Sequence, residues 1–543
     1  MKRTSKQSII LSAVLFLVCV FSIRHLYTVP LILSFLLLGG IAITRQSRSS
    51  TLGLVVSLLL LYPLPSWGWL IGRDTHFAAQ LSHHLLTATW PISPGEIQRG
   101  FIQTPGIHFS SAILSRITGL PIIPKSSETL LVTAILPIVY LGITVLFGWV
   151  LIRDYTNKSW TASAMTAILV IGLWSKLLRF NSAFHRVSLA MAVFAVFTYC
   201  LYRGTNQRGW RWIRILSFFV IVVSHHFASV MALGLAIVTK IVDNYAPRVR
   251  KTRRSPLSAN GIIIFCTLFF MWQFIVSLGG AFVVRNAFSI GQSVSPPTPD
   301  SWPIVSRSLY TSYQLKLSGW LYNAILGLPI FAAIVLELKK RERIRRWDAV
   351  GLLFGVFVAG FAIISTGAFA LNYDRILTYF VVAAGWLAPL KLTNIKTIQW
   401  TRKYVSGVFV ILLILVAISG VQPHVLGGDV RYEEGIKTEQ FDAEMYATAE
   451  WINSYNNHQL LGDMNTQEVV TSKTGMWVAM GPRQVLSSNI RAGYHMIHHD
   501  RNNRLYFGQT KYGSTNLLTD NLEVNLNRRN SVIYTTNKTS IYR

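Results

Sequence analysis

Long apolar runs separated by short polar segments dominate the first 422 residues of the chain. A helix needs about 20 apolar residues to cross a bilayer, and most of the runs approach this length. The runs cover residues 8–23, 27–43, 52–71, 129–152, 160–177, 185–202, 212–224, 226–242, 259–283, 317–338, 348–367, 374–390 and 404–421. This pattern predicts about thirteen membrane spans, the first of them retained because no small-residue cleavage site follows it.

The pattern changes after residue 422. Residues 441–455 have helical spacing, with Met445, Ala449 and Ile452 on one face. Two short strands are predicted at 459–462 and 484–486, and a hairpin at 531–542. The predicted fold class is therefore mainly α. A polytopic transmembrane domain (1–422) is followed by a small α/β extramembrane domain (423–543).

Composition and charge agree with a membrane protein. Mean hydropathy is +0.41 and only 13% of residues are charged, whereas a soluble domain has about 25%. The net charge is +29, but the basic excess lies in short loops between apolar runs, where it encodes membrane topology. Nucleic acid is not a predicted partner, because it requires a basic groove on a soluble surface.

The positive-inside rule orients the chain with its N-terminus in the cytoplasm. It also separates 212–224 from 226–242, because a single merged helix would put the basic cluster 248–254 outside. The long loop 72–128, the loop 284–316 and the C-terminal domain then lie on the extracytoplasmic side. The predicted location is the cell membrane, with multiple passes.

Carboxylates are scarce in the membrane part, and Asp74 stands at the edge of a predicted span in Gly72-Arg-Asp-Thr-His76. A low dielectric makes a carboxylate more basic, as a catalytic base requires. An amphipathic stretch, 76–90, follows it. Asp74 is therefore a candidate base. The structural alternative is an N-cap for the helix that follows.

Arg375 follows Asp374 at another outer membrane boundary, where a guanidinium can grip a lipid phosphate. The alternatives are a local Asp374–Arg375 pair and simple snorkelling. His226 lies at the outer tip of the short helix pair, either lining a cavity or facing lipid headgroups. The sequence His495-Met-Ile-His-His-Asp500 contains residue types that bind metals. It lacks the i, i+4 histidine spacing by which helical metal sites of hydrolases are recognised. The sequence identifies no cofactor and no metal-binding residues. It leaves open whether the protein uses a divalent cation.

The layout and several short motifs together resemble the GT-C glycosyltransferases, which use polyprenyl-phosphate sugars. The similarity is to the prokaryotic, especially archaeal, branch and covers 1–422 in architecture. The motifs are Gly72-Arg-Asp-Thr-His76, Pro105-Gly-Ile-His108, Thr118-Gly-Leu120, Ser224-His-His226 and Tyr373-Asp-Arg375. The resemblance implies inverting transfer of a sugar from a lipid-linked donor to an acceptor glycan, lipid or protein, with membrane lipid as a further partner.

Under this resemblance Asp74 is the base and Arg375 binds the donor phosphate. His76, His108, His226 and Asp374 are candidate cavity residues. One carboxylate and a basic clamp suffice, because a phosphate leaving group needs positive charge rather than a general acid.

Two departures leave the acceptor open. Asp74-Thr75 stands where protein O-mannosyltransferases have an Asp-Glu pair, and the tail has no Trp-Trp-Asp-Tyr-Gly of oligosaccharyltransferases. The alternative functions are a glycan polymerase or ligase that consumes diphosphate-linked donors, a lipid or glycan flippase, and a non-catalytic membrane scaffold.

Overall fold

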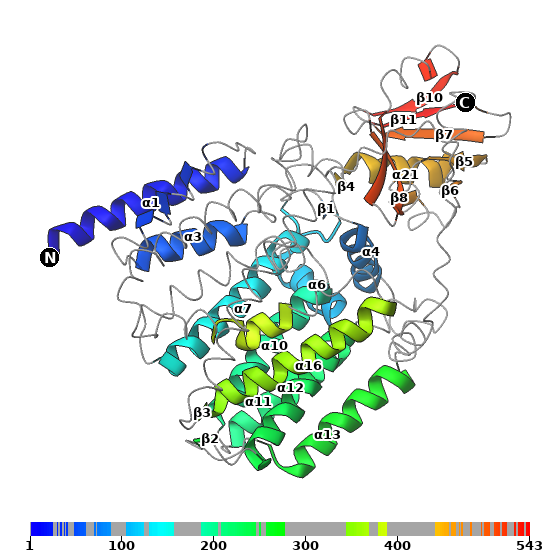
Figure 1. Cartoon of the computed structure of the whole chain (residues 1–543). Coiled ribbons are helices and arrows are strands. Elements are labelled where there is room, and N and C mark those ends of the chain that lie inside the picture. Colours follow the sequence, from blue (N-terminus) through cyan, green and yellow to red (C-terminus); the bar gives the residue numbers. More distant parts are fainter. Residues whose placement is uncertain are drawn as a thin grey trace.

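A computed structural model of the chain shows a helical bundle with a smaller sheet-containing part beyond one end (Figure 1). It describes residues 2–24, 48–60, 70–71, 73–87, 105–123, 130–156, 186–204, 208–245, 249–250, 257–276, 344–368, 378–387, 440–441, 443–455, 458–462, 478–479, 494–499, 504–510, 513–518, 530–536 and 539–543. Shorter described pieces lie between 30 and 41 and between 466 and 470, and at 490, 526 and 527.

The bundle helices form where the apolar runs predict them. They are α7 (Val132–Thr156), α10 (Arg186–Arg203), α11 (Arg208–Ser224), α12 (His226–Tyr245), α13 (Ala259–Phe270) with its π-helical extension η2 (Met271–Val276), α16 (Arg346–Ala368) and a segment containing η3 (Val381–Gly385). Within the described residues, three helices are long and apolar enough to cross a membrane: Val132–Thr156, His226–Tyr245 and Ala259–Val276. The predicted spans 160–177, 317–338 and 404–421 lie outside the described residues, so the total of thirteen stays a prediction.

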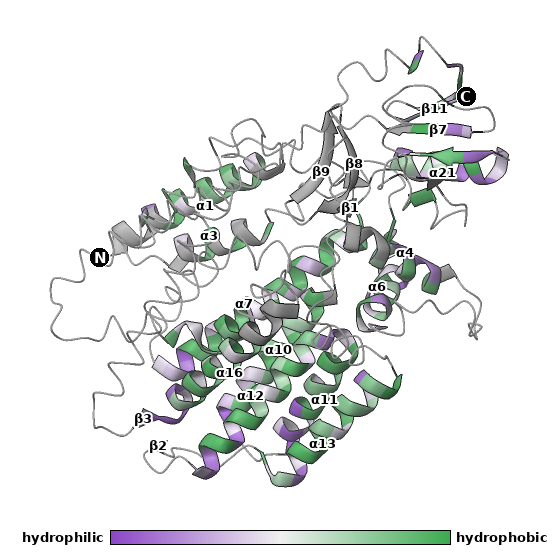
Figure 2. Ribbon diagram, turned by 45° about the vertical axis from the view of Figure 1, so that its right-hand side comes forward, coloured by the Kyte–Doolittle hydropathy of each residue, from purple (hydrophilic) through white to green (hydrophobic). Residues whose placement is uncertain are grey.

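Helix α10 lies in the middle of the bundle, where Ala190, Met191, Phe194 and Phe197 are buried against the neighbouring helices. Figure 2 shows that the helices are hydrophobic along most of their length. Small residues allow the helices to approach closely inside the bundle. A Cβ at Gly351 of α16 would stand 2.9 Å from the Cβ of Ala384. Such small-residue contacts are typical of helix packing in membranes.

Two further helices, α1 (Lys2–Arg24) and α3 (Arg48–Leu60), pack on each other beside the bundle. The hydroxyls of Ser12 and Ser50 lie 2.6 Å apart between them. Large apolar side chains of α1, including Ile10, Leu17 and Phe21, face outward. An outward apolar face on a helix is what contact with lipid requires.

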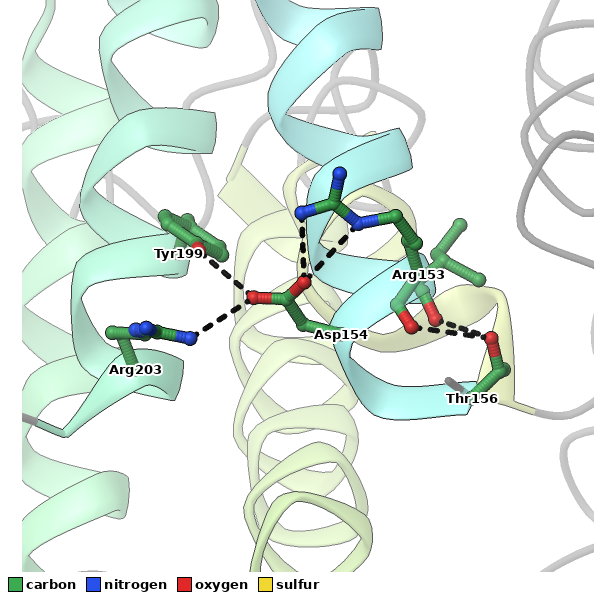
Figure 3. Close-up of polar contacts among 6 residues, drawn as sticks. Arg153, Asp154, Thr156, Tyr199 and Arg203 are labelled. Atoms are coloured by element: carbon green, nitrogen blue, oxygen red, sulfur yellow. Dashed lines mark hydrogen bonds and ion pairs between the residues drawn. The ribbon is translucent and has the colours of Figure 1, made fainter. Parts of the chain in front are cut away.

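At one end of the bundle, acidic residues bind basic and hydroxyl groups. Asp154 accepts from Nη2 of Arg153 at 3.0 Å, from Tyr199 Oη at 2.9 Å and from Nη1 of Arg203 at 3.3 Å (Figure 3). Tyr155 Oη donates to Asp348 at 2.5 Å. Asp154 is thus held by two arginines and a tyrosine, and Asp348 binds a tyrosine hydroxyl.

Helices α11 and α12 form a hairpin that turns at His225. One straight helix over 208–245 would separate its ends by about 55 Å. Instead, Arg346 binds both Asp243, near the end of α12, and the carbonyl of Leu201, just before the start of α11. The prediction of two separate helices is therefore correct.

Short strands mark the two ends of the bundle (Figures 1 and 2). At one end, β2 (Val249–Arg250) pairs in parallel with β3 (Ile344–Arg345). At the other, β1 (Leu70–Ile71) pairs antiparallel with β4 (Gln440–Phe441). The predicted span 52–71 was thus too long, because its last two residues are apolar strand residues that pair with the C-terminal segment.

The C-terminal segment has the predicted helix and a small sheet. Helix α21 (Ala443–Tyr455) buries Met445, Ala449 and Ile452 as predicted. A five-stranded sheet has the order β10-β11-β7-β5-β6, formed by β5 (Gln459–Leu461), β6 (Val478–Ala479), β7 (Tyr494–His499), β10 (Val532–Thr535) and β11 (Thr539–Tyr542). Strands β8 (Arg504–Thr510) and β9 (Gly513–Leu518) form a separate hairpin. The predicted hairpin 531–542 is confirmed, whereas 484–486 lies outside the described residues.

Candidate active site

The segment that contains Asp74 is a helix joined directly to a strand. Strand β1 ends at Ile71, and α4 (Arg73–Thr87) begins two residues later, so Asp74 is the second residue of the helix. A carboxylate in the first turn is favoured by the helix dipole. The side chains of Asp74 and His76 lie outside the described part of the structure, so the role of Asp74 as a base stays a prediction.

The inner face of α4 packs against α6 (Pro105–Thr118). Ala78, Ser82 and Leu85 are buried there, and they lie on the same helical face as Asp74 because they follow it at positions i+4, i+8 and i+11. This spacing confirms the predicted amphipathic helix.

His108 bridges the two helices. Its Nδ1 lies 3.0 Å from Ser82 Oγ, which donates its single hydrogen to the carbonyl of Ala78 at 2.7 Å. His108 is only 2% exposed. Since Ser82 is two turns, about 12 Å, beyond Asp74, His108 fixes α4 against α6 at a distance from the carboxylate.

The start of α6 meets the tip of the α11–α12 hairpin. A Cβ at Gly106 would lie 2.8 Å from Ser224 Oγ and 3.1 Å from Leu189 Cδ2. Only a residue without a side chain fits there without displacing these neighbours. The structure therefore brings together two motifs that are 118 positions apart in the sequence, Pro105-Gly-Ile-His108 and Ser224-His-His226.

The two histidines of the tip stack on one another, with ring centroids 4.7 Å apart and an interplanar angle of 15°. His225 is buried, and its Nδ1 accepts weakly from the backbone N–H of Ala228 at 3.4 Å. His226 is half-buried and also contacts the ring of Phe227. His225 therefore packs within the protein, whereas the two alternatives for His226, lining a cavity or facing lipid headgroups, stay predictions.

Sequence reasoning missed Gln273, which supports the same tip from the π-helix η2. Its Nε2 donates to the carbonyl of Val222 at 2.9 Å and to Ser229 Oγ at 3.3 Å. These acceptors flank His225 on the two arms of the hairpin. A lone glutamine inside the apolar run 259–283 was the available signal, because buried polar groups in membrane helices need partners. Single-turn π-helices are frequent at functional sites.

Two other predicted sites have different outcomes. Asp374 and Arg375 lie outside the described residues.

In the C-terminal segment, His495 is buried and its ring centroid lies 4.3 Å from that of His458. Burial, the neighbouring His458 and Arg543 lower the pKa of His495. Among the described residues, no group of three or more metal-binding side chains exists.

Comparison with known proteins gives a fold but no sequence relative. The sequence matches no protein-family model and no curated protein. Among solved structures, ArnT from Cupriavidus metallidurans bound to undecaprenyl phosphate is similar, with a TM-score of 0.51 and 11% identity. The match covers 91% of this chain and 97% of that one. The oligosaccharyltransferase of Archaeoglobus fulgidus in its apo form matches with a TM-score of 0.48 and 11% identity, over 84% of this chain and 70% of that one.

The match to ArnT extends over almost the whole of both chains, so it describes the arrangement of the bundle together with the C-terminal part. The chain therefore shares the fold of ArnT over almost its whole length.

Proposed function

We propose that the chain is a membrane glycosyltransferase that moves a sugar from a polyprenyl-phosphate donor to an acceptor at the extracytoplasmic face. The observation that carries the proposal is the full-length fold similarity to ArnT, whose structure contains undecaprenyl phosphate. The meeting of α4, α6 and the α11–α12 tip supports it, because these elements contain three of the motifs shared with GT-C enzymes. The transmembrane part is 1–422, and residues 423–543 lie outside the membrane.

The reaction requires one base and one anion-binding group. The acceptor hydroxyl attacks the anomeric carbon as the bond from that carbon to the phosphate oxygen breaks. Asp74 takes the hydroxyl proton, and the polyprenyl phosphate leaves as an anion beside Arg375. A single displacement inverts the anomeric centre, whereas a retaining double displacement needs two carboxylates about 5 Å apart. His76, His226 and Asp374 are proposed to line the cavity, and His108 to fix its helices.

The test uses the purified full-length chain with a series of polyprenyl-phosphate sugars, following sugar transfer and donor hydrolysis. Wild type should turn over, and Asp74→Asn should lose at least about 100-fold of the rate, because a general base contributes about 10²–10⁴-fold. Asp154→Asn is the matched control. Asp154 lies near the C-terminal end of α7, away from the candidate site, so this substitution should leave the rate unchanged.

Retained transfer in Asp74→Asn would exclude Asp74 as the base. Absence of turnover with every monophosphate donor, with acceptors supplied, would argue against the proposed reaction. Consumption of a diphosphate-linked donor would instead indicate a polymerase or ligase. Movement of a labelled lipid between leaflets would indicate a flippase.

A further inference from the structure

Strands β1 and β4 form the contact from which a role for the C-terminal segment follows. Leu70 lies opposite Phe441, and Ile71 lies opposite Gln440. Each strand is followed, after one intervening residue, by a helix: α4 after β1 and α21 after β4. The start of the helix that contains Asp74 is thus paired with a strand about 370 residues later in the chain.

Helix α21 is itself fixed to the sheet at two levels. Glu444, in its first turn, accepts from Thr536 Oγ1 at 2.9 Å. Two turns further on, Trp451 stacks on Tyr534 with ring centroids 4.7 Å apart. Both partners belong to the β10–β11 hairpin region. Because β4 leads directly into this anchored helix, its direction is determined by the C-terminal sheet.

One hydrophobic cluster continues this connection through side chains. It includes Ala78 and Ala79 of α4, Ile107 of α6 and Leu136 of α7. The same cluster includes buried residues of α21 and of three strands of the sheet, namely Met445, Tyr446, Ala449, Ile452, Leu460, Ile497 and Ile541. The C-terminal segment therefore shares a core with the helices of the candidate site rather than forming a core of its own.

We infer that the C-terminal segment positions α4 in the transfer site through the β1–β4 pair, instead of serving as a separate binding module. The inference rests on the proposed function, in which Asp74 at the start of α4 is the base. A carboxylate displaced by about 1 Å loses much of its rate contribution, whereas donor binding elsewhere in the bundle is unaffected. Residues 440 and 441 are thus positioning residues.

The first experiment breaks the strand pair. In an antiparallel ladder one of two successive pairs exchanges both backbone hydrogen bonds, so Gln440→Pro/Phe441→Pro removes a donor whichever pair it is. We expect kcat to fall at least tenfold, the donor KM to change less than twofold, and hydrogen exchange in 73–87 to accelerate. Ile533→Pro is the control: Ile533 is the unpaired residue of a bulge on the edge strand β10, where proline is tolerated.

Hydrogen exchange separates this inference from the proposed function, since it needs no turnover. Faster exchange in α4 without transfer by any variant would contradict the function and support the positioning role. Unchanged exchange in α4, or an unchanged kcat, would overturn the positioning role.

A second pair of variants covers the case in which the proline variant does not fold. Leu70→Cys/Phe441→Cys joins directly opposed residues, whose Cα separation in antiparallel strands suits a disulfide. The oxidised protein should keep its kcat within twofold, as should the control Thr535→Cys/Ser540→Cys in the β10–β11 hairpin. A tenfold loss only on oxidation of the 70–441 pair would show that the strands separate during turnover and would overturn the inference.

Discussion

Arg346 donates from Nε and Nη2 to the two carboxylate oxygens of Asp243, at 2.5 and 3.0 Å, between helices α16 and α12. Its Nη1 donates to the carbonyl of Leu201 at the end of α10, 3.2 Å away. Both charged side chains are nearly inaccessible, with exposures of 6% and 5%. One guanidinium therefore joins three helices of the bundle.

Replacing Asp243 by asparagine should destabilise the protein strongly, because it leaves the Arg346 charge buried without its counter-ion. Removal of one partner of a buried pair costs about 3–5 kcal/mol. The measurement is thermal or denaturant unfolding in detergent. Asp154→Asn is the control, because Arg153 and Arg203 around it are 43% and 39% exposed and such pairs contribute about 1 kcal/mol or less. Equal losses of stability in the two variants would show that burial does not set the contribution of these ion pairs.

Gly106→Ala should weaken the contact between α6 and the hairpin tip. The new methyl group would stand 2.8 Å from Ser224 Oγ, and such overpacking costs about 1–3 kcal/mol. Adding Ser224→Ala should restore part of the loss, because the nearest atom is removed. Gly142→Ala on α7 is the control, since nothing lies within 4 Å of the added methyl group. Thermal stability and transfer rate should fall in Gly106→Ala and not in Gly142→Ala.

Ser82→Ala should separate α4 from α6 more than a neighbouring serine substitution does. It removes the hydroxyl that forms a hydrogen bond with the buried His108 Nδ1, at a cost of about 1–3 kcal/mol. Ser111→Ala removes an equally buried hydroxyl that, among the described residues, binds carbonyls of its own helix, those of Ile107 and His108. Hydrogen exchange in 73–87 should therefore increase in Ser82→Ala and not in Ser111→Ala.

The C-terminal segment should lose stability as the pH falls below about 6.5. Burial lowers the pKa of His495, so the unfolded chain binds the proton more readily than the folded chain. Stability is thus complete above the unfolded value of 6.5 and declines as the pH falls towards the folded value. His495→Gln should flatten this dependence of the melting temperature. The measurement runs from about pH 7.5 to about pH 5.5, which is about one pH unit on either side of the ordinary histidine pKa. An unchanged slope in the variant would assign the dependence to other groups.

Hydrophobic periodicity and charge predicted the secondary structure well where they act locally. The basic cluster that follows the run 226–242 predicted two helices, because only a turn between them satisfies the positive-inside rule. The structure has this turn at His225. The buried face of α21 was readable from its 3.6-residue period. Both features depend on residues close together in the chain.

Long-range pairing was not readable in the same way. Leu70 and Ile71 continue an apolar run, so nothing local distinguishes a membrane helix from a strand that finds its partner at Gln440 and Phe441. The hydrogen bonds of Gln273 to the hairpin tip likewise join segments that are far apart in the sequence. The short motifs indicated the neighbourhood of Gly106 and Ser224 through a family resemblance, without specifying their contact.

The pairing of β1 with β4 also sets an order of events during synthesis. Residues 440 and 441 follow residue 71 by about 370 positions, which at about 5–20 residues per second takes roughly 20–70 s. Until then a growing copy has α4 without its partner strand, although nearly all the membrane helices have been made. Under the proposed function and positioning role, a copy that lacks β4 does not consume lipid-linked sugar, and activity begins only when β4 has been made and has paired with β1.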